Sequence, residues 1–137
     1  MKAVMCLNNF WNWSGGMAQY LVWANEARSI PYPPPHPGGS WSEYQTFTAK
    51  FYNSKKAVEM FNNHIRFIVG RVNSISNTPY KDDATIMSWQ LANEPRGDRE
   101  IRAFSVWIEE TAKLIKSLDN NHLVTTGSEG DTPYPSA

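Results

Sequence analysis

The chain has 137 residues, a length that suits one domain, and its content of 41% hydrophobic and 13% aromatic residues is enough for a buried core. The 13 Lys and Arg residues equal the 13 Asp and Glu residues in number, which argues against a nucleic-acid partner or an anionic membrane surface. No apolar stretch approaches the length of a membrane span, so we expect no membrane partner.

Residues 3–7 form an apolar run of strand length, which is typical of a strand buried on both faces of a parallel sheet. Cys6, the only cysteine, lies in this run, so we expect a small buried thiol and no intrachain disulfide. An aromatic segment with two glycines follows at 10–16. It predicts either a shaped surface at the strand end or a local hydrophobic mini-core.

Residues 8–50 are predicted to form one long loop that connects this strand to a helix and contains a short helix over 17–26. The proline-rich segment 31–39 can be neither helix nor central strand. Its composition resembles a domain linker, but aromatic residues follow it at once, whereas flexible linkers are polar. Long loops of this kind are usually functional or disordered.

A long helix is predicted from Asn53 or Ser54, both suitable N-caps, to about Asn73. Steps of three and four residues give this helix one apolar stripe, made of Val58, Phe61, Ile65, Ile68, Val72 and Ile75. A loop over 76–83 leads to the next strand.

The second strand starts at Thr85 and ends in the sequence Asn-Glu-Pro-Arg at 93–96. Proline cannot extend a hydrogen-bonded ladder, so the strand delivers the carboxylate of Glu94 to its own end. Alternation places this carboxylate on the smaller, more polar face, with Ser88, Gln90 and Ala92.

A second helix is predicted from about Arg99 to Leu118, and a third strand over 122–126. The apolar face of this helix is expected to consist of Ile101, Phe104, Ile108, Ala112, Ile115 and Leu118.

The order strand, helix, strand, helix, strand predicts an α/β fold with parallel strands. Each strand ends in polar or aromatic residues, and ligand sites of such folds lie at that edge. The ends are 8–13, 93–96 and 128–129. The three histidines have no partner at metal-ligand spacing, so we expect neither a metal site nor a cofactor.

These residue types fit glycoside hydrolysis, which needs one carboxyl group as acid and another as nucleophile or base. Aromatic neighbours and a second carboxylate would raise the pKa of Glu94 and make it a good acid. Asn93 could bond a sugar hydroxyl, and aromatic rings suit the apolar faces of pyranoses. Alternatively, Glu94 is a surface carboxylate that caps the following helix.

Four segments in collinear order resemble glycoside hydrolase family 5, most of all its endo-β-1,4-mannanases. They are 9–16, 80–86, 87–96 and 121–130. The resemblance implies a (β/α)8 TIM barrel, of which residues 1–137 form a single partial catalytic domain with the third to fifth strands. It also implies retaining hydrolysis of β-mannan, glucomannan or galactomannan, and an extracellular or periplasmic parent enzyme.

The resemblance implies roles for individual residues. Glu94 matches the general acid/base, and Asn93 matches the partner that contacts the sugar 2-hydroxyl. Trp11 corresponds to a sugar-stacking tryptophan, and Trp13 of the same loop is expected to contact substrate as well. Arg96 corresponds to an arginine on the leaving-group side of the cleft.

The resemblance is incomplete at the second catalytic carboxylate. The family nucleophile lies on the seventh strand, and no position here matches it. Glu129 matches a carboxylate at the end of the fifth strand, with an expected supporting role. Three strands cannot close a barrel and leave two open edges. We therefore expect either a piece of a longer enzyme or self-association through the open edges.

Two other functions stay open at this point. One is a different family 5 β-glycanase, such as an endoglucanase, although the loop at 11–16 favours a mannanase. The other is a non-catalytic carbohydrate-binding or assembly module, which would use the aromatic rim and need no nucleophile.

Overall fold

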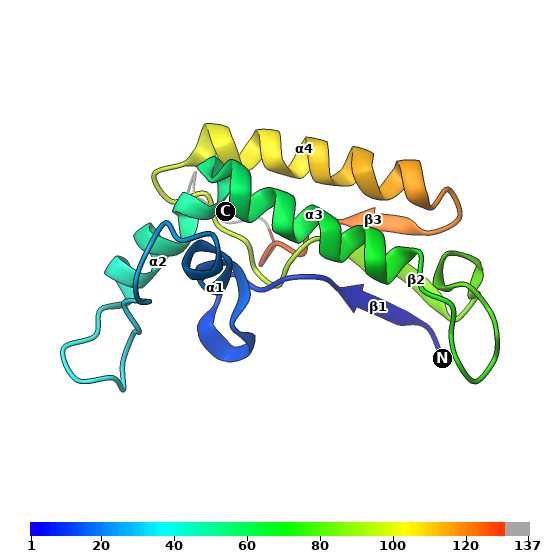
Figure 1. The fold of residues 1–137 in the computed structure, drawn as a ribbon, viewed down its shortest axis with the longest axis horizontal. Helices are drawn as coiled ribbons and strands as arrows, with labels where there is room; N and C mark the ends of the chain where they lie inside the picture. Colours follow the sequence, from blue (N-terminus) through cyan, green and yellow to red (C-terminus); the bar gives the residue numbers. More distant parts are fainter. Residues whose placement is uncertain (131–137) are drawn as a thin grey trace.

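The computed structural model describes residues 1–130, and the turns expected over 131–137 lie outside this range. The elements of the described chain are β1 (Ala3–Cys6), η1 (Asn12–Ser14), α1 (Gly16–Trp23), α2 (Trp41–Ala49), η2 (Lys50–Asn53), α3 (Lys55–Val69), η3 (Tyr80–Asp82), β2 (Ile86–Gln90), α4 (Ile101–Leu118) and β3 (Leu123–Thr125). The strands form one parallel sheet in the order β1-β2-β3 (Figure 1). This confirms the predicted α/β order.

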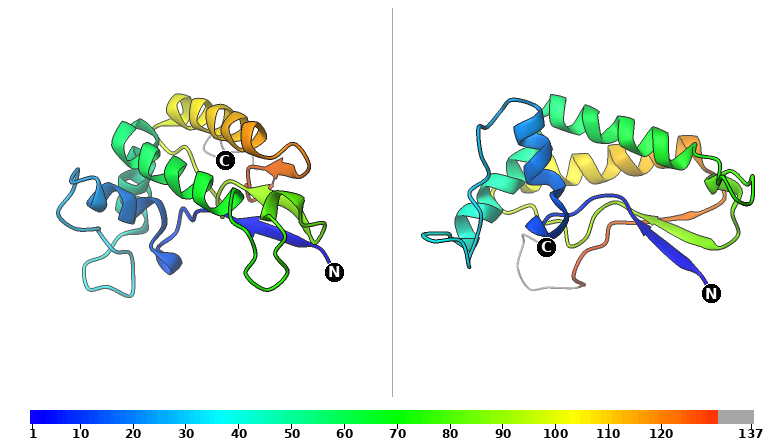
Figure 2. Two further views of the ribbon diagram at one scale, coloured as in Figure 1. Left: turned by 45° about the vertical axis from the view of Figure 1, so that its right-hand side comes forward. Right: turned by 60° about the horizontal axis from the view of Figure 1, so that its bottom comes forward.

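Helices α3 and α4 pack against each other and cover one face of the sheet (Figure 2). On that face Met5, Trp89 and Val124 lie side by side in the parallel register. The indole of Trp89 is fully buried, and the other two side chains pack against the same core. The three strands do not close into a barrel, and self-association through their edges stays a prediction.

The prediction that β1 is buried on both faces is wrong. Val4 and Leu123, on the face that the helices do not cover, are 44% and 66% exposed. Cys6 is also exposed, not buried as expected, because its register pairs it with Gln90 on this open face. Alternating exposure along β1 is what a sheet covered on one side produces.

Helix α3 begins as predicted, because the Ser54 hydroxyl accepts a hydrogen bond from the Ala57 amide at 3.0 Å. It ends at Val69, earlier than predicted, with Gly70 as its C-cap. Val72 and Ile75 were therefore placed wrongly on the buried stripe and are 52% and 93% exposed. Phe61 and Ile65 are buried as expected.

The long connection at 8–50 is less irregular than predicted. It contains the expected short helix, α1, and a second helix, α2, that the prediction missed. The Ser40 hydroxyl accepts a hydrogen bond from the Glu43 amide at 3.3 Å at the start of α2. Ser and Glu three residues apart are a capping-box pattern, so the sequence did contain a signal for this helix.

Helix α4 is confirmed, but its buried face is rotated from the predicted one. Ile101 is 42% exposed, whereas Trp107 and Thr111, which were not on the predicted face, are buried. The Trp107 ring lies against Phe104 and against aromatic rings from α3 and η2. Aromatic packing between α3, α4 and η2 therefore sets the rotation of α4.

A buried polar cluster joins the end of α4 to strand β2. Asp119, which is 2% exposed, accepts a hydrogen bond from Trp89 Nε1 at 2.7 Å. The ring of His122 lies 2.6 Å from the same carboxylate through Nδ1 and 2.9 Å from the Asp83 carbonyl through Nε2. The sequence pattern predicted only that the helix ends at Leu118, the residue before Asp119.

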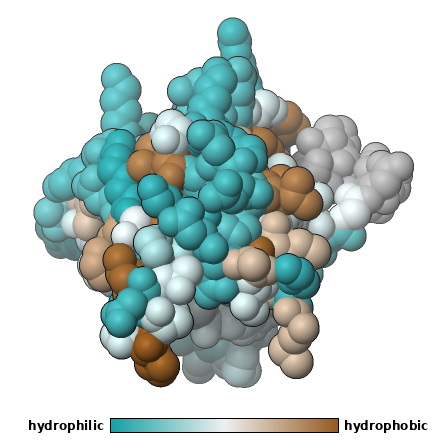
Figure 3. Space-filling view, turned by 90° about the vertical axis from the view of Figure 1, so that its right-hand side faces the viewer, coloured by the Kyte–Doolittle hydropathy of each residue, from teal (hydrophilic) through white to brown (hydrophobic). Residues whose placement is uncertain are grey.

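The two edges of the sheet differ in what surrounds them. At the amino ends of the strands the surface is mainly hydrophilic, with isolated hydrophobic side chains (Figure 3). The carboxyl ends lie on the side of α1 and α2, where the aromatic residues of the loop after β1 gather (Figure 1). Within residues 1–130, no helix has the length and hydrophobicity needed to cross a bilayer.

Candidate functional site

The ends of the three strands converge, as the parallel order predicts. Beyond β1 and β2, Asn9 and Asn93 pair in parallel, and the backbone N–H of Asn93 donates to the backbone carbonyl of Asn8 at 2.9 Å. The Glu94 amide donates to the Gly127 carbonyl beyond β3 at 3.0 Å. These backbone hydrogen bonds fix the position of Glu94 between the segments that follow β1 and β3.

Glu94 turns sharply away from the strand direction. Its φ of 47° lies in the left-handed region, which costs a residue with a side chain about 1 kcal/mol or more. The carboxylate accepts a hydrogen bond from Trp11 Nε1 at 2.7 Å. Helix α4 begins only at Ile101, with Glu100 as its N-cap, so the alternative that Glu94 caps this helix is wrong.

Arg96 links the three segments around the carboxylate. Its guanidinium carbon lies 4.9 Å from the centre of the Trp11 ring. Its Nε donates to Glu129 Oε2 at 2.8 Å, and its Nη1 donates to Gln45 Oε1 at 3.1 Å. The side chains of Arg96 and Glu129 are 30% and 29% exposed, so the ion pair is partly shielded from solvent. Gln45, which lies on α2, was not among the predicted site residues.

The aromatic segment after β1 combines the two predicted possibilities. Phe10 and Trp11 are buried and belong to the core, whereas Trp13 is 67% exposed. Trp41 of α2 packs edge-on against Trp11, with 5.7 Å between ring centres. Trp41 was not predicted to belong to the site; its position directly after the proline-rich segment was the available signal.

Tyr44 of α2 anchors the aromatic segment that follows β1. Its hydroxyl donates to the Phe10 carbonyl at 3.1 Å, and its side chain is fully buried. Burial raises the pKa of Tyr44 to about 12, so the hydroxyl stays protonated near neutral pH and continues to donate. Helix α2 thus fixes the aromatic segment through both Tyr44 and Trp41.

Asn93 is anchored by its neighbour across the strands. Its Nδ2 donates to Asn9 Oδ1 at 3.3 Å, and the same oxygen accepts from the Trp11 amide at 3.0 Å. Asn93, Asn9 and Ser14 line a hollow of about 520 Å³ beside the strand ends. The amide of Asn93 is therefore held at the wall of a space that can admit a polar ligand.

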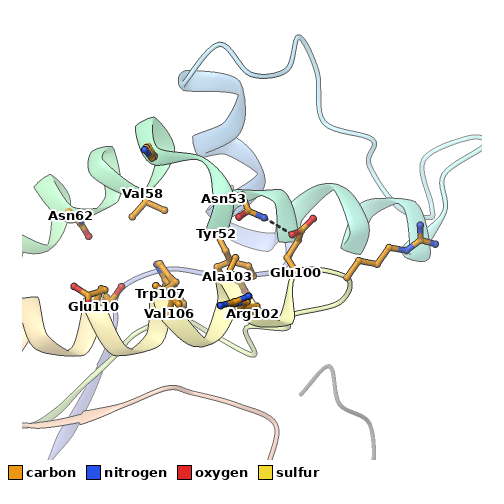
Figure 4. A pocket seen from close by; sticks show the side chains of 13 residues that line it. Tyr52, Asn53, Val58, Asn62, Glu100, Arg102, Ala103, Val106, Trp107 and Glu110 are labelled. Atoms are coloured by element: carbon orange, nitrogen blue, oxygen red, sulfur yellow. Dashed lines mark hydrogen bonds between the residues drawn. The ribbon is translucent and has the colours of Figure 1, made fainter.

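A second hollow, also of about 520 Å³, lies between α3 and α4 (Figure 4). Val58 and Trp107 project into the gap from the two helices. Its lining includes none of the predicted site residues. Volume alone would not have distinguished this hollow from the strand-end site.

Gly127 supports the backbone of Glu94 at close range, and its replacement by alanine is expected to be costly. Its φ is 82°, and a Cβ at this position would lie 2.0 Å from the Ala92 carbonyl oxygen. We expect Gly127→Ala to lower the free energy of unfolding by about 2 kcal/mol or more, as measured by urea denaturation.

Gly130→Ala is the matched control, because Gly130 also has a positive φ but a Cβ there would meet no atom of the described chain within 4 Å. We expect a smaller loss for this variant. Equal losses would mean that backbone strain alone, and not the contact with Ala92, sets the cost at Gly127.

Comparison with known proteins gives consistent matches over the chain. Residues 1–136 match the sequence family described as GH family 5 beta-mannosidase-like. Mannan endo-1,4-beta-mannosidase 1 of Solanum lycopersicum is 38% identical over 132 residues, which are 95% of this chain and 30% of that protein. A mannan endo-1,4-beta-mannosidase 4 of Oryza sativa subsp. japonica is 36% identical over 129 residues, 93% of this chain and 25% of that protein.

Solved structures agree with these sequence matches. A glycoside hydrolase family 5 mannosidase from Rhizomucor miehei superposes with a TM-score of 0.85 at 40% identity, over 96% of this chain and 31% of that one. An endo-1,4-beta-D-mannanase from Thermotoga petrophila superposes with a TM-score of 0.73 at 32% identity, over 98% of this chain and 35% of that one. The chain thus spans about a third of the length of these enzymes.

Proposed function

Because the chain belongs to the β-mannosidase-like group of glycoside hydrolase family 5, we propose that it forms the acid/base side of a site that hydrolyses β-1,4 bonds in mannans. The predicted resemblance to this family is confirmed, as is the α/β sheet that corresponds to part of its barrel. The observation that carries the proposal is the position of Glu94 at a strand end, where Trp11 connects it to the Arg96–Glu129 pair.

In the proposed reaction Glu94 acts twice. Protonated Glu94 first gives its proton to the glycosidic oxygen while a second carboxylate attacks the anomeric carbon and the bond to the leaving sugar breaks. Ionised Glu94 then takes a proton from the water that hydrolyses the glycosyl-enzyme. Glu129 is not the second carboxylate in this proposal, because Arg96 already engages it. These 137 residues do not supply the nucleophile.

The remaining predicted residues would hold the sugar chain. Asn93 can bond the hydroxyl next to the anomeric carbon from the wall of its hollow. The exposed indole of Trp13 can cover the apolar face of a pyranose. Arg96 would lie on the leaving-group side. The proposed substrates are β-mannan, glucomannan and galactomannan; a structure of a variant of the Rhizomucor mannosidase contains mannosyl-fructose.

A hybrid enzyme tests the proposal. Residues 1–136 would replace the matching segment of the Rhizomucor miehei mannosidase, with the unmodified enzyme as reference. We expect the hybrid to release reducing ends from galactomannan and glucomannan much faster than from carboxymethylcellulose. Circular dichroism and thermal unfolding would establish that the hybrid is folded.

The two alternative functions predict other results for the same hybrid. A preference for carboxymethylcellulose would support another family 5 β-glycanase and contradict the mannanase proposal. A folded hybrid that binds mannotetraose without cleaving any of these polysaccharides would support a non-catalytic binding module instead.

A further inference from the structure

Trp11 meets Glu94 through its edge. The indole Nε1 donates to Glu94 Oε2 at 2.7 Å, although the two residues are 83 positions apart in the sequence. An indole N–H can only donate a hydrogen bond, so Trp11 can neither give its proton to the reaction nor take one from Glu94. A donor of this kind binds a carboxylate more strongly than a neutral carboxyl group.

The faces of the Trp11 ring are occupied by the protein itself. The side chain is 7% exposed, with Phe10 edge-on at 5.4 Å and Trp13 at 5.7 Å between ring centres. The guanidinium of Arg96 lies over the ring at 4.9 Å. A pyranose that stacks on an indole needs an open face, and Trp13, which is 67% exposed, has one.

Arg96 is fixed in place over Trp11 by partners from other segments. Glu129 beyond β3 and Gln45 of α2 both accept hydrogen bonds from its guanidinium. A cation over the face of an indole is attracted by the ring and draws electron density from it, which polarises the N–H bond. The ion pair with Glu129 therefore acts on Glu94 through Arg96 and Trp11.

We propose that Trp11 is a positioning residue for Glu94 and not a sugar platform. The inference rests on the proposed function, in which Glu94 is the acid/base. Trp11 holds one carboxylate oxygen, Oε2, and leaves Oε1 as the oxygen that carries the transferred proton. When Glu94 gives up this proton, the hydrogen bond from Trp11 becomes charge-assisted, so it stabilises the carboxylate as that charge develops.

The full chain, labelled with nitrogen-15, provides the test by NMR of its indole N–H signals. The signal that disappears in Trp11→Phe identifies Trp11. In Glu94→Gln we expect this signal to move upfield, because the oxygen of a carboxamide is a weaker hydrogen-bond acceptor than the oxygen of a carboxylate. The indole of Trp89, which donates to Asp119 at the same distance of 2.7 Å, is the internal control and is expected to stay in place. An unmoved Trp11 signal in Glu94→Gln would overturn the proposal.

Titration of the same chains with mannotetraose separates positioning from stacking. We expect Trp11→Phe to bind the sugar within about twofold of the unchanged chain, and Trp13→Ala to bind it about tenfold more weakly, the loss typical of an anchoring aromatic contact. Equal weakening by both variants would make Trp11 a platform and overturn the proposal. If neither the unchanged chain nor the hybrid enzyme that carries it binds mannotetraose, the proposed function fails, while the indole signals still decide whether Trp11 positions Glu94.

Discussion

Glu94→Gln in the hybrid enzyme is expected to lower kcat for galactomannan by about 10²–10⁴-fold, the usual contribution of a general acid/base. Glutamine has nearly the same shape and can still accept a hydrogen bond from Trp11, but it cannot transfer a proton. The measurement is the steady-state release of reducing ends by the two hybrids. Because sugar binding does not need the proton, we expect KM to change much less than kcat.

The choice of substrate shows whether the lost step is proton transfer. A mannoside with a dinitrophenolate leaving group needs no protonation to depart, so its first step should survive in Glu94→Ala. The second step still lacks a base to activate water, and the mannosyl-enzyme should accumulate. Azide needs no base, so its addition is expected to restore turnover and to yield mannosyl azide with retained configuration.

Two further glutamate variants serve as controls. Glu109→Gln changes an exposed side chain on α4 that pairs with Lys113, and we expect kcat to stay within about twofold because surface pairs contribute little. Glu129→Gln removes the negative charge that pairs with Arg96, and we expect it to lower kcat less than Glu94→Gln does. A Glu94→Gln hybrid that keeps its full activity on galactomannan would contradict the acid/base role.

Local sequence patterns were sufficient to predict the three strands, helices α1, α3 and α4, and the order of these elements. Apolar alternation and helical spacing are properties of short segments, so β2, α3 and α4 could be placed from the sequence. Strand β2 ends at Gln90, earlier than predicted, but backbone hydrogen bonds to the neighbouring segments continue to Glu94, so Pro95 did mark the end of this ladder and identified Glu94. Helix α2 was not predicted, because the proline-rich segment directly before it indicates irregular structure, although Ser40 and Glu43 form a capping pattern.

The contacts within the site could not be predicted in the same way. The hydrogen bond from Trp11 to Glu94 and the approach of Arg96 to the same indole depend on how three strand ends pack together. The left-handed backbone of Glu94 has no local signature, because that conformation usually falls on glycine. The burial of Asp119 with His122 likewise results from packing between α4 and the sheet.

Asp119→Ala is expected to lower the free energy of unfolding by about 3–5 kcal/mol, the cost of breaking a buried hydrogen-bond network. The Trp89 N–H and the ring of His122 would lose their shared acceptor inside the core. The backbone amides of Asn121 and His122, at 2.8 Å and 3.1 Å, would lose theirs as well. Urea denaturation at neutral pH measures the loss.

Asp82→Ala is the matched control for this experiment. The Asp82 carboxylate is exposed and accepts one hydrogen bond, from Asn121 Nδ2 at 3.2 Å. We expect its removal to cost about 1 kcal/mol or less, since solvent can replace the bond. If both substitutions lowered the free energy of unfolding equally, the buried hydrogen bonds of Asp119 would not contribute the stability that we expect from them.

The dependence of the loss on pH tests whether the charge of Asp119 matters. Burial raises the pKa of Asp119, but hydrogen bonds from Trp89 and His122 and from two backbone amides outweigh it and hold the pKa below its ordinary value. A carboxyl group with a lowered pKa stabilises the fold above its unfolded-state pKa, and this contribution is lost as the pH falls through the folded-state pKa. The difference in the free energy of unfolding between the unchanged chain and Asp119→Asn is therefore expected to reach its largest value above about pH 5 and to decrease below about pH 4. A difference that is the same at every pH would mean that Asp119 acts through its shape and its acceptor oxygens, with no contribution from its ionised form.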